Sequence, residues 1–300
     1  MTAMNGASQE WLRYCATQEQ LDTFNNDGYL VVEDALPPEM IQRLTQVVDG
    51  IEDEERKRQD LDSHQILQKF RTVIEDDIFL QLLDWPKTFP LVWDILGWNI
   101  QLYISHLIIY PPELEKKVEE LGTGGWHQDG GRPVREMERP QPRLSLKVSY
   151  WLTDVDSPSN GAMQIIPGSH KLDALPPSSD LDDGKVLDLC VKAGTAVLFD
   201  RRMWHRRGLN TSNISRKVLF FGYSYRWLRG LDFNLMPQEV LKKCDVDIKG
   251  WWQPTEADVS LRTWIKVLSA RLPFWIAKAS SLSAKPDSSE SIGSYSDFSR

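Results

Sequence analysis

The sequence predicts a mainly β fold, an antiparallel barrel or jelly roll with helices before and after it. Two observations lead to this prediction. After about residue 98, helical periodicity gives way to short runs in which apolar and polar residues alternate. Turn residues such as Asn160-Gly161 and Pro167-Gly168 separate these runs. Several short strands joined by turns are typical of closed or two-sheet antiparallel folds.

The first elements are helical. Thr17 followed by Gln20 forms a capping-box pattern, which predicts a helix that contains Leu21 and Phe24. The β-rich run 28–32 comes next. Pro38 suits the first turn of a second helix, which we expect to carry a charged, solvated stretch over 52–62.

The strands of the core follow. The clearest alternation runs from Leu144 to Thr153, where Leu, Val and Tyr alternate with Ser, Lys and Thr. The other expected strands are 100–104, 163–166, 186–191, 195–199 and 218–223. We therefore expect a single domain over 1–250, with a helical part at about 1–98 and a jelly-roll core at about 99–226.

The C-terminal segment has a different composition. Residues 251–279 follow a helical pattern rich in Trp, and the Ser-rich residues 280–300 predict a disordered tail. The amphipathic stretch 259–276 has two simple interpretations, packing against the barrel or a homodimer contact. Contact with a membrane or another partner is the alternative.

Composition excludes some classes of protein. Acidic residues (43) outnumber basic ones (35), which gives a net charge of −8 and argues against a nucleic-acid binder. The sequence shows no signal peptide and no apolar run long enough to cross a membrane. The three cysteines lie far apart and are interpreted as free thiols, so we expect a cytoplasmic protein.

The sharpest chemical feature is His127-Gln128-Asp129. On an extended chain, side chains two positions apart point to the same face, so His127 and Asp129 could bind one metal ion. A second histidine would complete the two-histidine, one-carboxylate arrangement of non-haem iron(II) oxygenases. The pattern alone also fits a surface histidine beside an unrelated aspartate.

His205 and Arg216 strengthen the metal hypothesis. His205 follows the β-rich run 195–199, and Arg216 precedes the run 218–223. A dicarboxylate such as 2-oxoglutarate would chelate iron at one end. Its far carboxylate would need a bidentate cation, which the planar guanidinium of Arg supplies better than Lys.

These motifs resemble the phytanoyl-CoA dioxygenase family of iron(II)- and 2-oxoglutarate-dependent oxygenases. The resemblance covers roughly residues 17–226. It includes Phe24-x-x-x-Gly28, the metal segment, Asn160-Gly161 with the Pro167-Gly168-Ser169-His170-Lys171 turn, and His205 with Asn210 and Arg216. It implies a double-stranded β-helix, a cupin-like jelly roll with the metal at its mouth.

The resemblance also implies roles for individual residues. His127, Asp129 and His205 would bind Fe(II), and Arg216 would bind 2-oxoglutarate. Gln128 matches a position that faces the co-substrate or is structural, and Tyr150 or Trp151 would line the pocket. Arg206-Arg207 departs from the family, whose members often carry small residues there.

The remaining histidines and arginines have simpler interpretations. His170 is expected to shape its turn, and His64 and His106 to be structural or solvated. The arginines between Arg132 and Arg143 form either a solvated loop or a lid over an anionic substrate.

The implied function is an oxidoreductase, a dioxygenase that consumes O2 and 2-oxoglutarate, releases succinate and CO2, and hydroxylates an unactivated C–H bond. Its substrate would be a small or lipid-like molecule. Two alternatives belong to other classes: a jelly-roll module that binds a metal or small acid without turnover, and a scaffold that acts through the C-terminal helices.

Overall fold

The computed structural model describes residues 13–113, 125–130, 137–176, 184–233 and 236–244. All of them belong to one compact unit, Arg13–Pro254. The C-terminal helices and Ser-rich tail expected over 251–300 lie outside the described residues. No helix within the described ranges has the length and hydropathy needed to span a membrane.

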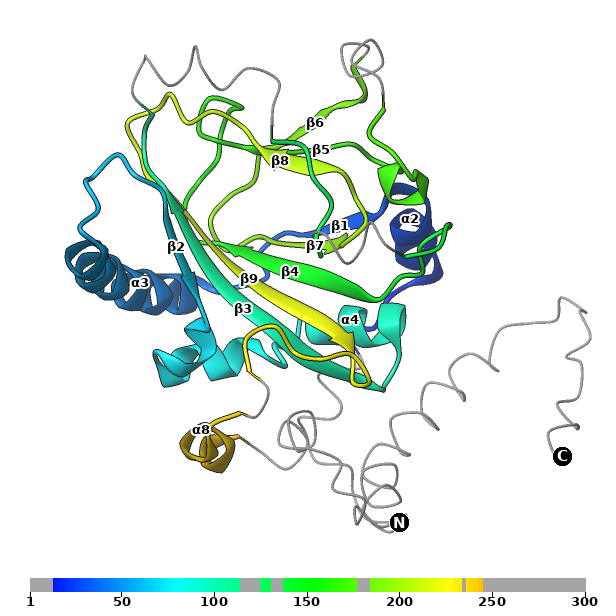
Figure 1. The fold of residues 1–300 in the computed structure, drawn as a ribbon, viewed down its shortest axis with the longest axis horizontal. Coiled ribbons are helices and arrows are strands. Elements are labelled where there is room, and N and C mark those ends of the chain that lie inside the picture. The colour runs from blue at the N-terminus through cyan, green and yellow to red at the C-terminus, as the bar shows by residue number, and fades with distance from the viewer. Residues whose placement is uncertain (1–12, 114–124, 131–136, 177–183, 234–235, 245–300) are drawn as a thin grey trace, which may run out of the picture. The chain divides into compact units, whose positions relative to one another are not determined.

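Two antiparallel sheets form the core (Figure 1). The larger has the strand order β1-β7-β4-β9-β3-β2, and the smaller has the order β6-β5-β8. The strands are β1 (Tyr29–Val32), β2 (Leu67–Phe70), β3 (Ile100–Tyr110), β4 (Ser145–Trp151), β5 (Met163–Ile165), β6 (Leu187–Leu189), β7 (Ala196–Asp200), β8 (His205–Arg207) and β9 (Arg216–Tyr225). The predicted jelly roll is confirmed.

The first helix, α2 (Gln18–Asp27), forms where the capping box predicts it. The Thr17 side chain accepts from the Gln20 backbone amide, and the Gln20 side chain accepts in return from the Thr17 amide. Gly28 ends the helix with φ +86°, a left-handed conformation that glycine adopts at little cost. The chain then enters β1 directly.

Helix α3 (Pro38–Gln59) begins at the predicted proline and buries one apolar stripe. His64 lies beyond its end, in a turn, so the charged helix ends earlier than expected. The remaining helical elements are η1 (Thr72–Ile74), η2 (Asp77–Leu82), α4 (Phe89–Leu96), η3 (Ser169–Lys171) and α8 (Gln238–Lys243).

The outer face of the larger sheet packs against η2 and α4. Tyr150 on β4 shares a hydrogen bond with Thr88 (2.6 Å), and Tyr223 on β9 donates to the carbonyl of Leu83 (2.7 Å). Because helices cover this face, the apolar members of the β4 alternation point outward. Its polar members, including Lys147, point into the space between the sheets.

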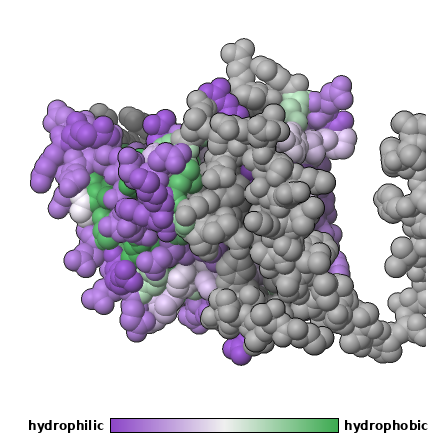
Figure 2. Space-filling model, turned by 90° about the horizontal axis from the view of Figure 1, so that it is seen from below, coloured by the Kyte–Doolittle hydropathy of each residue, from purple (hydrophilic) through white to green (hydrophobic). Residues whose placement is uncertain are grey.

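An apolar cluster fills part of that space. Trp151, Phe199, Val218 and Met163 belong to it and come from both sheets. This core supports the inner face of the barrel and leaves room for a cavity beside it. In the view of Figure 2, the coloured surface is mostly hydrophilic, with green hydrophobic atoms showing between purple ones.

Candidate metal centre

Two segments far apart in the sequence bring His127 and His205 together. The backbone amide of each histidine donates to the carbonyl of the other, both at 3.0 Å, so the two residues form an isolated antiparallel bridge. Residues paired in this way present their side chains on the same face. The two imidazole centroids are 4.2 Å apart.

Asp129 reaches the same face because it lies two residues after His127. Its backbone amide donates to the carbonyl of Arg201 at 2.8 Å, which continues the pairing. One potential ligand atom from each of His127, Asp129 and His205 lies within 4.8 Å of the other two. The three side chains therefore meet at one point, as the H-x-D pattern and the distant histidine predict.

Backbone carbonyls orient both histidines. The Nδ1 of His127 lies 2.8 Å from the carbonyl oxygen of Gly125, and the Nδ1 of His205 lies 2.9 Å from that of Met203. Such contacts keep the proton on Nδ1 and leave the Nε2 lone pair for a metal. Burial lowers the pKa of His205 to about 4, so this ring is neutral at pH 7.

Lys147 holds the carboxylate of Asp129 in place. Its Nζ lies 2.8 Å from Oδ1, whereas Oδ2 is buried and has no hydrogen-bond partner among the described residues. Although burial alone would raise the pKa of Asp129, the charge of Lys147 and the nearby histidines lower it to about 2. The side chain thus offers one free carboxylate oxygen beside two imidazoles, a donor set that fits Fe(II).

Arg216 lies deep in the same cavity, on β9, and is 5% exposed. One guanidinium nitrogen donates to the carbonyl of Gly161, and the group lies 5.1 Å from the ring centroid of Tyr110 and 5.4 Å from that of Trp151. Burial lowers its pKa to about 10, so it stays charged at pH 7.

No carboxylate among the described residues pairs with Arg216, and its Nε has no hydrogen-bond partner there. A buried unpaired charge is costly, so this arrangement is typical of a site for an anionic ligand. The far carboxylate of 2-oxoglutarate has the charge and shape to fit it.

A cavity of about 310 Å³ joins the metal-ligand cluster to Arg216. Its size is at the lower end of the range for small-molecule sites. Trp151, Phe199 and Phe220 form much of its wall, and the edge next to β2 is lined by Ile66 and Gln68.

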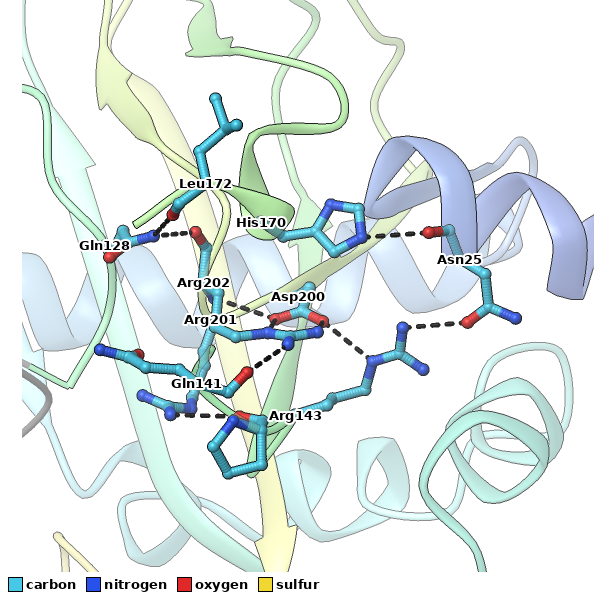
Figure 3. Close-up of polar contacts among 10 residues, drawn as sticks. Asn25, Gln128, Gln141, Arg143, His170, Leu172, Asp200, Arg201 and Arg202 are labelled. Atoms are coloured by element: carbon cyan, nitrogen blue, oxygen red, sulfur yellow. Dashed lines mark hydrogen bonds and ion pairs between the residues drawn. The ribbon is translucent and has the colours of Figure 1, made fainter. Parts of the chain in front are cut away.

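Two predicted pocket residues face elsewhere. The Gln128 amide donates to the backbone carbonyl of Arg202 (Figure 3), and Gln128 is not part of the cavity lining, which favours the structural alternative. Tyr150 and Trp151 were alternatives for the pocket aromatic. Side chains alternate along a strand, and Tyr150 points toward α4 and does not line the cavity. Its neighbour Trp151 lines the cavity.

The buried carboxylate of Asp200 is the centre of a polar network that extends to the end of α2 (Figure 3). It accepts hydrogen bonds from Arg143 and Arg202, with nitrogen–oxygen distances of 2.9 and 2.7 Å. Arg143 also donates to the Asn25 side chain, and the His170 ring contacts the Asn25 carbonyl at 3.1 Å. His170 therefore has a structural contact, but it attaches the turn to α2 instead of forming a side-chain hydrogen bond within the turn.

The arginines considered as a lid have different surroundings. Arg143 is fixed by Asp200, and Arg139 pairs with the exposed Asp173 at 3.5 Å. Arg132 and Arg135 lie outside the described residues. The described arginines of this stretch therefore serve as surface and structural contacts.

The Arg206-Arg207 pair lies at the edge of the cavity. Arg207 forms an ion pair with Glu113 at 3.0 Å and lies over the Tyr110 ring at 4.4 Å, near Arg216. Arg206 lies over the Trp126 ring at 4.7 Å. The bulky residues that depart from the family pattern therefore add positive charge to the cavity.

Several residues of the cavity were not predicted from the sequence, among them Lys147 and His106. Lys147 is the charged member of the β4 alternation, which was a usable signal. His106 was interpreted as structural or solvated, but it lines the cavity and is 8% exposed. Nothing in the local sequence distinguishes it from an ordinary strand histidine.

Comparison with known proteins gives a consistent result. The family model described as phytanoyl-CoA dioxygenase (PhyH) matches residues 24–218. An ectoine dioxygenase of Nocardia farcinica is 25% identical over 238 residues, which cover 69% of this chain and 77% of that protein. An uncharacterised protein of Mycobacterium bovis is 26% identical over 247 residues, 77% of this chain and 85% of its own length.

Solved structures share the fold. EctD from S. alaskensis with bound Fe has a TM-score of 0.57 and 21% identity, and the match covers 81% of this chain and 86% of that one. HygX from Streptomyces hygroscopicus, solved with nickel and 2-oxoglutarate, has a TM-score of 0.56 and 16% identity, with coverage of 70% and 87%.

Proposed function

Because the chain belongs to the phytanoyl-CoA dioxygenase family, we propose that His127, Asp129 and His205 hold its iron and that Arg216 binds its 2-oxoglutarate. Family membership makes the chain an iron(II)- and 2-oxoglutarate-dependent dioxygenase, an oxidoreductase that uses O2. The assignment of residues to these roles is the proposal.

One observation carries it: the ligand cluster and an unpaired buried arginine line the same small cavity. One potential ligand atom of each of the three residues lies within 4.8 Å of the other two, and Oδ2 of Asp129 has no hydrogen-bond partner among the described residues. Arg216 offers its guanidinium to an anion deeper in that cavity. A ligand that chelates a metal with one end and carries a carboxylate at the other satisfies both.

When bound, iron and 2-oxoglutarate supply the oxidising chemistry, in which O2 is consumed, succinate and CO2 are released, and the substrate is hydroxylated. The chain's own residues bind and orient. The carbonyls of Gly125 and Met203 fix the histidine rings, and Lys147 fixes the Asp129 carboxylate. Trp151, Phe199 and Phe220 exclude water from the reacting centre.

We further propose hydroxylation of an unactivated C–H bond of a small or lipid-like substrate in the cytoplasm. The relatives' names support oxidation of a small molecule, since one is an ectoine dioxygenase. The volume of the cavity supports a small substrate, or a larger one of which only the reacting part enters. A homodimer contact through the C-terminal helices stays a prediction.

The test uses the 300-residue chain with Fe(II), ascorbate and 2-oxoglutarate, and measures succinate, metal content and 2-oxoglutarate binding. Asp129→Ala is expected to lose the metal. Arg216→Ala is expected to keep the metal but to bind 2-oxoglutarate at least tenfold more weakly, because a charge-assisted bidentate contact is lost. Arg43→Ala, at an exposed position on α3, is the matched arginine control.

Two results would contradict these assignments. Unchanged 2-oxoglutarate affinity in Arg216→Ala would place the carboxylate site elsewhere. Full metal content in Asp129→Ala would remove the ligand assignment. Metal and 2-oxoglutarate binding by the wild-type protein without any succinate formation would favour the non-catalytic binding module.

A further inference from the structure

His106 is a buried polar side chain that takes part in neither the proposed metal site nor the proposed 2-oxoglutarate site. It lies on β3, lines the cavity and is 8% exposed. Neither ring nitrogen has a hydrogen-bond partner within the described part of the chain. Buried polar groups are nearly always paired, so an unpaired one that faces a cavity calls for a ligand.

Packing alone does not explain a histidine at this position. The ring stacks on Phe70 with centroids 4.4 Å apart and planes at 11°, and it lies 5.7 Å from Phe220. A phenylalanine would fill the same space without burying two polar nitrogens. The neutral imidazole offers one donor and one acceptor that only a bound molecule could use.

The position of His106 separates it from the co-substrate site. In the pairing of β3 with β9, Tyr110 lies opposite Arg216, whereas His106 lies opposite Phe220, four residues along the strand. At the usual rise of a strand, this places the two sites about 13 Å apart. On the other side, β3 pairs with the edge strand β2, whose exposed Gln68 lines the same cavity.

The charge of the cavity favours an anion. Its lining includes four cationic side chains and, among the described residues, one carboxylate, that of Asp129; the cations are Lys147, Arg206, Arg207 and Arg216. Glu113 offsets one of them by pairing with Arg207. The two negative charges of 2-oxoglutarate are matched by the two positive charges of iron(II), so a cationic surplus remains for a second ligand.

Building on the proposed function, we propose that His106 is a substrate-binding residue and that the substrate is a small organic acid. Its apolar body would contact Ile66, Ile108 and Phe220, and its carboxylate would accept a hydrogen bond from the His106 ring. Gln68, at the cavity edge, would add a second donor. The substrate would then enter over β2, opposite the end that holds 2-oxoglutarate.

The experiment uses the 300-residue chain loaded with Zn(II), which is diamagnetic, and with saturating 2-oxoglutarate. The chain has five histidines, so selective ¹³C labelling of their rings gives five signals to follow by NMR. The probe is sodium hexanoate, compared with hexan-1-ol and hexylamine of the same chain length. His106→Phe assigns the His106 signal and removes its hydrogen bond, and His64→Phe, at an exposed position, is the matched control.

Hexanoate is expected to shift the His106 signal, to leave the His64 signal unchanged, and to bind about tenfold more weakly to His106→Phe, because one hydrogen bond to a charged group is lost. Equal hexanoate affinity in His106→Phe, or tighter binding of hexanol or hexylamine than of hexanoate, would overturn the proposal. Binding of 2-oxoglutarate is measured separately in each protein. If the wild type did not bind 2-oxoglutarate, the proposed function would be refuted. Normal 2-oxoglutarate binding without the hexanoate effects would refute the role of His106 alone.

Discussion

Replacing His106 by phenylalanine should remove part of the pH dependence of folding stability. Burial, followed by the charge of Lys147, lowers the pKa of His106 to about 3, although Asp129 opposes this effect. In the unfolded chain the same group titrates near its ordinary value of about 6.5. Below that value the unfolded state binds a proton that the folded state excludes, so stability is lost as the pH falls.

The magnitude follows from the two pKa values. Between about pH 7.5 and about pH 5, the unfolded His106 becomes almost fully protonated while the folded one stays neutral. About 1.5 pH units of this range lie below the unfolded pKa, and each is worth about 1.36 kcal/mol. Wild-type stability should therefore fall by about 2 kcal/mol through this group alone. The figure hardly depends on the folded pKa once that value lies below about 4.

Urea unfolding of the metal-free protein at the two pH values measures the effect. His106→Phe should lose about 2 kcal/mol less than the wild type on acidification. At the higher pH it should be at least as stable, because its ring packs between Phe70 and Phe220 without unpaired nitrogens. His64→Phe should behave as the wild type. An identical loss in His106→Phe and wild type would refute the reasoning.

Three further substitutions test the packing around the site, each by urea unfolding at neutral pH. Asp129→Asn should lower the free energy of unfolding of the metal-free protein by about 3 kcal/mol, because Lys147 is left buried without its carboxylate partner. Adding Lys147→Met should restore part of this stability. Gly28→Ala should lower the free energy of unfolding by about 1–2 kcal/mol because of the φ of +86°. The new Cβ, 2.5 Å from Nδ1 of His170, should add the cost of a clash. His170→Ala should relieve only the clash, so additive effects would contradict this explanation. Asp200→Asn should cost about 3 kcal/mol, because the fully buried carboxylate has two arginine partners; a loss under 1 kcal/mol would show that the pairs are not important for folding.

Much of the candidate metal centre could be predicted from the sequence. One signal, the His127-x-Asp129 spacing, is local, and the other, His205, is distant but follows a predicted strand. The two-residue spacing of His127 and Asp129 fixes their common face on an extended chain. The helix after Thr17 was predictable for the same reason, since a capping box is complete within four residues. His205 was predicted as the third ligand beside His127 and Asp129. Its backbone bridge to His127 was not predicted, because the two segments share no sequence pattern.

The sequence could not predict which side chains of β4 line the cavity, because this depends on which face of the sheet the helices cover. Alternation along β4 separates Lys147 and Trp151 from Tyr150 but does not say which set faces the cavity. Helices α4 and η2 decide this, because they cover the outer face of the sheet and the apolar side chains of β4, such as Tyr150, pack against them. β8 escaped prediction because its three residues, His205–Arg207, have no apolar pattern.

The pairing of His127 with His205 has a consequence for the protein without its metal. The two residues lie 78 positions apart in the sequence, and the bridge between them consists of two backbone hydrogen bonds. An ion held by both side chains would act as a cross-link that closes a long loop, much as a disulfide does. Metal loading would therefore do more than supply reactivity. It would attach the segment that carries two of the proposed ligands to the barrel, so that the site is most rigid when the metal is bound.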